Sequence, residues 1–185
     1  TIEVYRNDFE TSDLSGIGNG TVSTFNNSQV LGRYNNSGFQ LALSNLPKHD
    51  AIRISFDLNI HDNWDGNLGP DLWEMRADNQ VLVNTTFSNE YCPQFHCLPQ
   101  SYPNSYPNSN NNPKTGAENT ELPGFCHSAG RTFVTTRYRI SKTVLHTQNS
   151  FLLECKDKLK EAVADQLCDE SWSIDNMVVQ VVELD

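Results

Sequence analysis

Residues 52–89 read IRISFDLNIHDNWDGNLGPDLWEMRADNQVLVNTTFSN, and the first part of this stretch decides the fold. From Ile52 to Ile60 every second residue is apolar, and polar side chains fall between them. Alternation with a period of two is typical of a half-buried β-strand and not of a helix. A second alternating run follows from Leu72 to Phe87. We therefore expect an antiparallel β-sandwich organised around this stretch.

Shorter strand patterns lie on both sides of it, separated by clusters of turn residues. Strands at such short intervals indicate an all-β sandwich or barrel. One short helix is expected at 156–167, where Leu159, Val163 and Leu167 share a face. The other expected strands are 2–5, 21–25, 29–34, 39–43, 131–140, 150–155 and 171–184.

Length and composition favour a single domain over residues 1–185, because 185 residues can bury one hydrophobic core. The 23 acidic and 13 basic residues give a formal net charge of −10. That balance argues against nucleic-acid binding, which needs a basic face. No apolar run approaches the roughly eighteen residues of a membrane-spanning helix, so we expect no membrane insertion. The strand-like opening TIEVYRNDFE indicates a mature protein or an excised domain.

Residues 88–131 have a different composition from the rest of the chain. They are rich in Asn, Pro and Ser, include the tandem SYPNSYPNSN at 101–110, and show almost no apolar periodicity. Loops of this length inside a compact domain are usually functional or disordered. We predict an ordered loop insertion, in which Tyr102 and Tyr106 are candidate ligand contacts.

The loop HDNWDGNLGPDL at 61–72 concentrates side-chain oxygens around two glycines and a proline. Crowded carboxylates repel one another unless solvent or a cation neutralises them, and Ca²⁺ prefers hard oxygen ligands on a flexible turn. A solvated turn is the alternative, because Asp and Asn are common turn residues. The predicted Ca²⁺ ligands on this loop are Asp62, Asp65, Asn67 and Asp71.

Two further acidic clusters lie near the ends of the chain, at 8–10 and at 169–175. The first and last segments of a jelly roll are commonly neighbours, so Glu10 is expected to approach Asp175. We predict these two carboxylates as additional Ca²⁺ ligands that join the chain ends. Separate solvated turns are the alternative.

Three tryptophans each lie beside an acidic cluster. Trp64 is in the middle of the acidic loop, and an exposed aromatic ring beside a metal can support a sugar ring or an apolar side chain. We predict Trp64 as a ligand contact. Trp73 and Trp172 are on strands, where core packing is the more common role.

The chain has five cysteines, an odd number that leaves at least one unpaired within the chain. Cys155 and Cys168 flank the expected helix, and we predict a disulfide between them. A bond between Cys92 and Cys97, or between either of them and Cys126, stays open. The spacing of CPQFHC at 92–97 matches no closed zinc site. Disulfides together with few lysines and many Asn, Ser and Thr indicate an extracellular or secreted protein.

Motifs of common catalytic sites are missing from the sequence: it has no GxSxG, no HExxH and no phosphate-binding glycine loop. We therefore expect no enzymatic activity. A glycosidase-like pair of carboxylates is the remaining alternative, because such a pair is defined in space and not in sequence.

Four segments carry a resemblance to known families. NDFETSDL at 7–14 and SWSIDNMVV at 171–179 resemble the first and last strands of jelly-roll, galactose-binding-like domains, including carbohydrate-binding modules. FDLNIHDNWDGN at 56–67, with DESWSIDN at 169–176, is similar to calcium-dependent ligand-binding domains of bacterial surface adhesins. The resemblance covers about two thirds of the chain. It implies a jelly-roll sandwich and a structural or ligand-bridging Ca²⁺.

These observations predict an extracellular, non-catalytic, calcium-binding recognition module of a cell-surface or secreted protein. Its partner is expected to be a glycan or a peptide on a cell surface, with carbohydrate favoured. The alternatives are a calcium-dependent peptide-binding adhesion domain, a structural module of a surface filament or adhesin, and an enzyme acting on polysaccharides. Any of these is compatible with a place in a larger multidomain surface protein.

Overall fold

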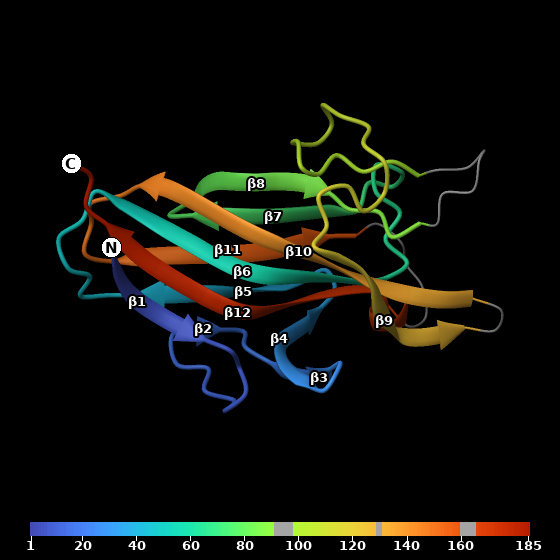
Figure 1. The fold of residues 1–185 in the computed structure, drawn as a ribbon, viewed down its shortest axis with the longest axis horizontal. Helices are drawn as coiled ribbons and strands as arrows, with labels where there is room; N and C mark the ends of the chain where they lie inside the picture. The colour runs from blue at the N-terminus through green and yellow to red at the C-terminus, as the bar shows by residue number, and fades with distance from the viewer. Residues whose placement is uncertain (91–97, 129–130, 160–165) are drawn as a thin grey trace.

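The computed structural model describes residues 1–90, 98–128, 131–159 and 166–185. These residues form an antiparallel β-sandwich of the jelly-roll type, with two sheets packed face to face (Figure 1). This confirms the predicted fold class. The described helical content is α1 (Gln166–Asp169). No helix in the described parts of the chain has the length and apolar character needed to cross a membrane.

Seven strands form the first sheet, in the order β3-β4-β12-β6-β10-β9, with β1 pairing to β12. Five strands form the second, in the order β2-β5-β11-β7-β8. The first sheet consists of β1 (Ile2–Asn7), β3 (Val22–Phe25), β4 (Ser28–Tyr34), β6 (Ala51–Asp62), β9 (Asn119–Ser128), β10 (Arg131–Leu145) and β12 (Glu170–Val182). The second consists of β2 (Ile17–Gly18), β5 (Gly38–Leu43), β7 (Leu72–Ala77), β8 (Gln80–Thr86) and β11 (Phe151–Lys158).

Strand β6 lies at the centre of the seven-stranded sheet, between β12 and β10. Its apolar side chains from Ile52 to Ile60 all face the five-stranded sheet and are fully buried. On β12, Trp172 pairs with Ile60 and Val181 with Ile52, so both strands present apolar side chains to one core. Burying each large apolar side chain contributes about 1.5–3 kcal/mol, which explains why this alternation determines the fold.

The first and last strands are neighbours, as expected. β1 runs antiparallel to β12, from the pair Ile2 and Val181 to the pair Asn7 and Met177. Both chain ends therefore lie at the same end of the sandwich (Figure 1). The loop after β1 is thereby placed beside the middle of β12.

The alternating run from Leu72 to Phe87 is a hairpin of two strands, β7 and β8. Asp78 and Asn79 form its turn, with positive φ angles of 45° and 67°. Two consecutive residues with positive φ suit the right-handed twist of a tight hairpin, and Asp and Asn tolerate that conformation. The polar residues 78–80 interrupt the alternation at this turn, which the sequence analysis treated as part of one run.

Two further elements differ from the sequence predictions. Residues 156–158, expected to begin a helix, continue β11 because this strand pairs with β5 and β7 on both sides. Helix propensity is a weak preference that tertiary pairing overrides. Strand β9 lies inside the expected loop 88–131, and its polar composition gave no apolar alternation. Residues 160–165 of the expected helix are outside the described residues.

The described part of the long loop packs on the edge of the five-stranded sheet. The backbone N–H groups of Tyr102 and Tyr106 donate to the carbonyls of Thr86 and Asn84 on β8, at 3.2 and 3.0 Å. Within each SYPN repeat the Asn N–H bonds back to the Ser carbonyl, so the sequence repeat is also a repeat of turns. The loop thus covers an edge whose backbone groups are otherwise open to pairing.

Candidate functional site

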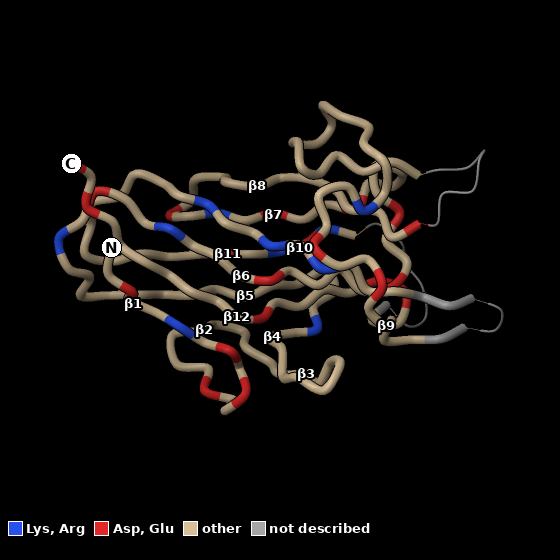
Figure 2. Tube along the Cα trace, in the orientation of Figure 1, with Lys and Arg blue, Asp and Glu red and all other residues tan. Residues whose placement is uncertain are grey.

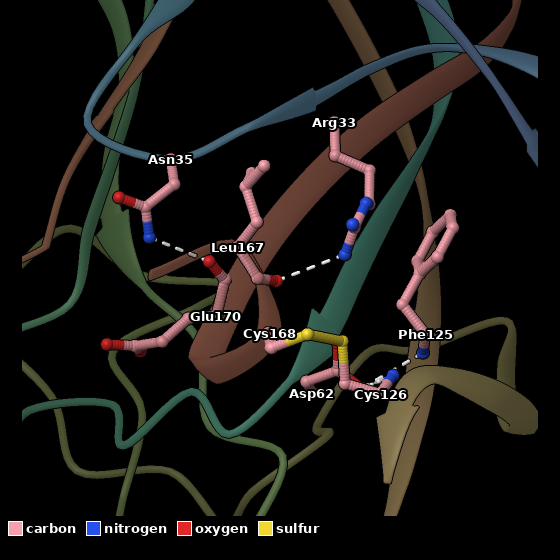
Figure 3. The surroundings of a disulfide bond; sticks show 8 residues. All are labelled: Arg33, Asn35, Asp62, Phe125, Cys126, Leu167, Cys168 and Glu170. Carbon is pink, nitrogen blue, oxygen red and sulfur yellow. Dashed lines mark hydrogen bonds between the residues drawn. A yellow bond between two sulfur atoms is a disulfide. The ribbon is translucent and has the colours of Figure 1, made fainter. Parts of the chain in front are cut away.

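The acidic loop that follows β6 makes contacts in several directions. Asp62 accepts hydrogen bonds through Oδ1 from the N–H groups of Phe125 and Cys126 on β9, at 3.0 and 3.4 Å (Figure 3). Asp71 accepts through Oδ2 from the N–H of Asp65, at 2.6 Å. Asp62 therefore joins the loop to β9, while Asp71 closes the loop on itself.

Asn67 connects the same loop to the long loop. Its amide oxygen accepts hydrogen bonds from the hydroxyls of Thr86 and Ser101, and its amide nitrogen donates to Ser109 O and Asn110 Oδ1. The hydrogen bonds of Asn67 to Ser101, Ser109 and Asn110 hold the SYPN repeats against the acidic loop. Within the described residues, no group of three or more His, Cys, Asp or Glu side chains is arranged to hold a metal ion. The Ca²⁺ site on this loop stays a prediction.

Glu10 and Asp175 are brought to one hydroxyl group, that of Ser28 on β4. The Ser28 Oγ lies 2.7 Å from Glu10 Oε1 and 3.4 Å from Asp175 Oδ2. Burial, helped by the neighbouring carboxylate of Asp57, raises the pKa of Asp175 from 3.8 to about 6. The ionised form of Asp175 is thus disfavoured in the metal-free chain, and a bound cation would relieve this. These oxygen donors come from three separate segments, the loop after β1, the start of β4 and the interior of β12, and oxygen is the ligand that Ca²⁺ prefers.

Trp64 is not available as a ligand contact, which corrects the prediction made from its position. Its side chain is fully buried, and its indole N–H donates to Ser171 O at 2.9 Å. The ring packs edge-on against Phe87. An indole offers the largest apolar surface of any side chain, so the loop folds inward and uses Trp64 as its anchor.

The two tyrosines of the repeat have different environments. Tyr102 packs against Phe87 and Tyr138 with ring centroids 5.0 Å apart in each pair, and burial raises the pKa of its hydroxyl. Tyr106 is half-buried on the loop surface. Ligand contact by either residue stays a prediction, and Tyr106 is the better placed for it.

The disulfide is between Cys126 and Cys168, not between Cys155 and Cys168 (Figure 3). Cys155 is a free thiol in the core, where β11 turns its odd-numbered side chains toward the other sheet. Burial raises the pKa of this thiol well above its ordinary value. The predicted pairing failed because closeness in sequence does not decide the direction of a strand side chain. Cys92 and Cys97 lie outside the described residues.

The disulfide ties β9 to α1 beside a small apolar cluster on the outer face of the seven-stranded sheet. Phe25, Val30 and Leu122 form this cluster, and Phe125 packs against it. The guanidinium of Arg33 lies 4.1 Å from the centre of the Phe125 ring, a cation–π contact, and Figure 3 shows it donating to Leu167 O at 3.1 Å.

A depression with several polar lining residues lies on the five-stranded sheet, where β5 begins and β11 ends. We call it the β5–β11 depression; it has a volume of about 380 Å³. Its floor includes Gly38, where a Cβ atom would lie 1.9 Å from Cys155 O. Its polar lining comes from Asn19, Asn36, Ser37, Gln40, Glu154 and Lys156. A volume of this order holds a small ligand.

The rim of the β5–β11 depression is held from beneath by a buried carboxylate. Asp157 accepts the N–H groups of Asn36 and Ser37, at 2.7 and 3.1 Å, and the indole N–H of Trp172. Burial raises the pKa of Asp157. Asn19 fixes the other side of this turn through a hydrogen bond from its amide nitrogen to Ser37 Oγ, at 3.1 Å. The backbone of the rim is therefore set before any ligand arrives.

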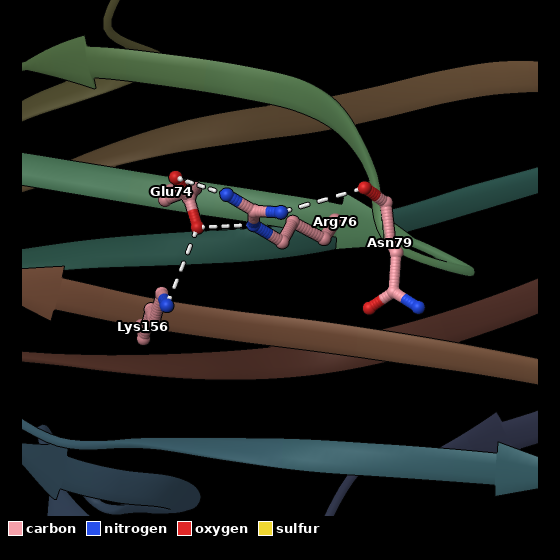
Figure 4. A network of polar contacts seen from close by, with 4 residues as sticks. All are labelled: Glu74, Arg76, Asn79 and Lys156. Carbon is pink, nitrogen blue, oxygen red and sulfur yellow. Dashed lines mark hydrogen bonds and ion pairs between the residues drawn. The ribbon is translucent and has the colours of Figure 1, made fainter.

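The side chains above this rim are open for contact. In the described part of the chain, no hydrogen bond occupies the side chains of Gln40 and Glu154. Lys156 lies 3.6 Å from Glu74, which also accepts from Arg76 at 2.6 Å (Figure 4). The hydrogen bond from Arg76, with the positive charges of Arg76 and Lys156, lowers the pKa of Glu74. Lys156 also lines the depression.

Sequence reasoning did not find this depression. Gln40, Glu154 and Lys156 are ordinary outward-facing positions of two alternating strands, and a pattern of polar residues there also describes a plain solvated face. Their convergence depends on the pairing of β5 with β11, in which Gln40 is opposite Glu154. Negative charge gathers elsewhere, in the loop after β1 and at the β9 end (Figure 2).

No protein-family model matches the chain, and no curated protein matches it. Similar solved structures include a family 35 carbohydrate binding module from Clostridium thermocellum, with 10% identity, coverage of 90% of this chain and 91% of that one, and a TM-score of 0.41. Another is the module CBM6cm-2 from Cellvibrio mixtus lichenase 5A, in complex with cellotriose. It has 11% identity to this chain and a TM-score of 0.37, and the match covers 98% of this chain and 100% of that one.

A third similar structure is the family GH115 4-O-methyl-α-glucuronidase BtGH115A, with 11% identity and a TM-score of 0.45. All of this chain is covered, but only 18% of that enzyme. The first two structures are carbohydrate-binding modules, the class that the sequence resembles. At these identities and TM-scores the likeness supplies no ligand and no functional residue.

Proposed function

We propose that this chain is a non-catalytic recognition module of a secreted or cell-surface protein, and that it binds carbohydrate in the β5–β11 depression. The observation that carries the proposal is the pair of polar side chains, Gln40 and Glu154, that make no hydrogen bond within the described residues and lie beside Lys156 above a rim fixed by Asp157. Gln40 offers both a donor and an acceptor, Glu154 accepts, and Lys156 donates. Sugar hydroxyls donate and accept at once, so a mixed set of this kind suits them.

Two further features support the wider proposal. The Cys126–Cys168 disulfide is typical of proteins in an oxidising, extracellular setting. The oxygens of Glu10 and Asp175 around Ser28 favour a structural Ca²⁺ that joins the chain ends. In this proposal Ca²⁺ stabilises the scaffold and is separate from the depression, which contains neither of those carboxylates.

The test is a glycan array followed by calorimetric titration of the best glycan. We expect Gln40→Ala and Glu154→Ala each to weaken binding at least about tenfold, the effect of losing a hydrogen bond of about 1.5 kcal/mol. Gln180→Ala is the matched control, since it removes the same amide from the other sheet and should bind like the wild type. Absence of binding to any glycan, with binding of peptides instead, would overturn the proposal.

A further inference from the structure

Three turns meet at the end of the sandwich opposite the long loop (Figure 1). The first is 44–50, between β5 and β6, and it carries His49. The second is 146–150, between β10 and β11, and it begins with His146. The third is the β7–β8 turn, which carries Asp78. His49 is 3% exposed and the side chain of His146 is 7% exposed, so both imidazoles are withdrawn from water.

A continuous row of hydrogen bonds joins these turns. Its three distances are 2.6 Å from Pro47 O to His49 Nδ1, 2.7 Å from His49 Nε2 to His146 Nδ1, and 2.9 Å from His146 Nε2 to Asp78 Oδ2. The imidazole planes differ by only 8°. Asp78 also accepts the N–H of Leu152 through Oδ1, at 2.9 Å. The row therefore runs from one backbone carbonyl to one fixed carboxylate.

Counting protons shows that two neutral imidazoles cannot complete this row. Pro47 O and an ionised Asp78 only accept, so a proton must lie on His49 Nδ1 and another on His146 Nε2. A third proton must lie between the two rings. Two neutral imidazoles carry two protons in total, and every arrangement of two leaves at least one pair of acceptor atoms facing each other. The row is complete when the pair carries one additional proton, whose charge Asp78 balances.

We propose that His49, His146 and Asp78 form a proton-dependent clasp that holds the three turns together. The clasp is closed while the two imidazoles share three protons, and it opens as the pH rises and the third proton leaves. A fourth proton, at low pH, also opens it, because two N–H donors would then face each other between the rings. The holding strength of the clasp therefore has a maximum at intermediate pH.

The surroundings leave Asp78 as the carboxylate that contacts the imidazoles. Asp50 presents its backbone carbonyl to the N–H of His146, at 3.0 Å, and its carboxylate accepts the N–H of Leu184, at 2.8 Å. The ring of Phe151 packs edge-on against His146, so that side is apolar. The charged residues on the three turns and on the C-terminal segment 183–185 are Lys48, Asp50, Asp78, Glu183 and Asp185.

The clasp is independent of carbohydrate binding, because the β5–β11 depression lies at the opposite end of β5. Gly38 begins β5 at the depression, and Leu43 ends it near the turn of His49. Failure of either proposal therefore leaves the other standing.

The direct test is a nitrogen NMR titration of the imidazoles in the intact wild-type chain between pH 5 and 9. We expect three of the four ring nitrogens of His49 and His146 to carry protons in the lower part of this range. One proton should leave in a single step that both rings report. Amide hydrogen exchange at His146 and Leu152, corrected for intrinsic rates, should rise about tenfold across that step. Independent titration of the two rings, or two protons throughout, would overturn the proposal.

Variants supply the second test. His49→Gln donates through its amide nitrogen to Pro47 O and accepts from His146 Nδ1 through its amide oxygen, so the opening at low pH should vanish and only the rise in exchange at high pH should remain. Asp78→Asn keeps Oδ1 as the acceptor for Leu152 and offers Nδ2 to His146 as a donor, so two neutral imidazoles complete the row, and exchange should be slow at high pH and faster at low pH. Glu121→Gln, which neutralises an exposed carboxylate on β9, should behave as the wild type. An unchanged pH profile in both clasp variants would contradict the clasp.

Discussion

The indole N–H of Trp172 donates a 2.7 Å hydrogen bond to the carboxylate of Asp157, and this bond joins the two sheets inside the core. Trp172 belongs to β12 of one sheet and Asp157 to β11 of the other. The same carboxylate accepts the backbone of Asn36 and Ser37, where the chain crosses from β4 to β5. One buried side chain thus fixes the contact between the sheets and the rim of the depression.

Replacing this carboxylate is expected to destabilise the fold. Asp157→Ala leaves three N–H donors without an acceptor, among them the fully buried indole of Trp172, and we expect the free energy of unfolding to fall by about 3 kcal/mol. Asp157→Asn keeps one acceptor oxygen and should cost less. Urea unfolding followed by tryptophan fluorescence measures both. Equal stability of Asp157→Ala and the wild type would show that these bonds do not hold the rim.

Gly38 and Gly18 line the same depression and form a matched pair for mutation. Gly38→Ala puts a methyl group 1.9 Å from Cys155 O, a backbone atom that cannot move aside without breaking the pairing of β5 and β11. We expect a loss of about 3 kcal/mol or more. Gly18→Ala meets its nearest atom, Gln40 Oε1, at 3.6 Å, an ordinary contact, and should fold normally. Thermal unfolding distinguishes the two, and similar midpoints would contradict the close approach.

The disulfide makes a prediction about both stability and reactivity. Removing it in the double variant Cys126→Ala/Cys168→Ala is expected to cost about 2–4 kcal/mol, measured by unfolding in urea. Peptide mapping without reductant should recover the Cys126–Cys168 link. Cys155 should resist alkylation until the chain unfolds, because burial raises the pKa of its thiol. Rapid labelling of Cys155 in the native protein would be inconsistent with its place in the core.

Asp175 links pH, stability and calcium. Its raised pKa, about 6 against 3.8 in the unfolded chain, means that the native state binds this proton more tightly. In metal-free protein the free energy of unfolding should therefore fall by about 1–2 kcal/mol as the pH rises from about 4 to about 6. Asp175→Asn should remove this fall. Ca²⁺ binds the ionised carboxylate, so saturating Ca²⁺ should reduce the fall and raise the melting midpoint.

Two carboxylate variants serve as the test and the control for the calcium site at Glu10 and Asp175. Glu10→Gln should abolish the stabilisation by Ca²⁺, and Glu121→Gln, an exposed carboxylate far from Ser28 in the sequence, should keep it. A midpoint that does not change between chelator and Ca²⁺ would contradict the calcium site. The same measurement on Asp65→Asn tests the loop site predicted from the sequence.

Much of the architecture could be predicted because it follows from local patterns. The alternation from Ile52 to Ile60 specified a strand with one buried face, and the expected jelly roll, whose first and last segments are commonly neighbours, placed β1 beside β12. Strand β9 could not be predicted in this way, because its polar residues carry no apolar alternation, although it pairs with β10, the next strand along the chain. The approach of Glu10 to Asp175 was predicted, since neighbouring first and last strands bring their ends together.

Residue types and their spacing were sufficient to indicate an all-β sandwich, because the period of two is a property of each strand alone. They were insufficient for anything that depends on where a side chain points after packing. Trp64 turned inward, Cys168 met Cys126 instead of Cys155, and Gln40 came to face Glu154 across two paired strands. Each of these outcomes reflects contacts between residues far apart in the chain, whose energies appear only when the sheets close on a common core.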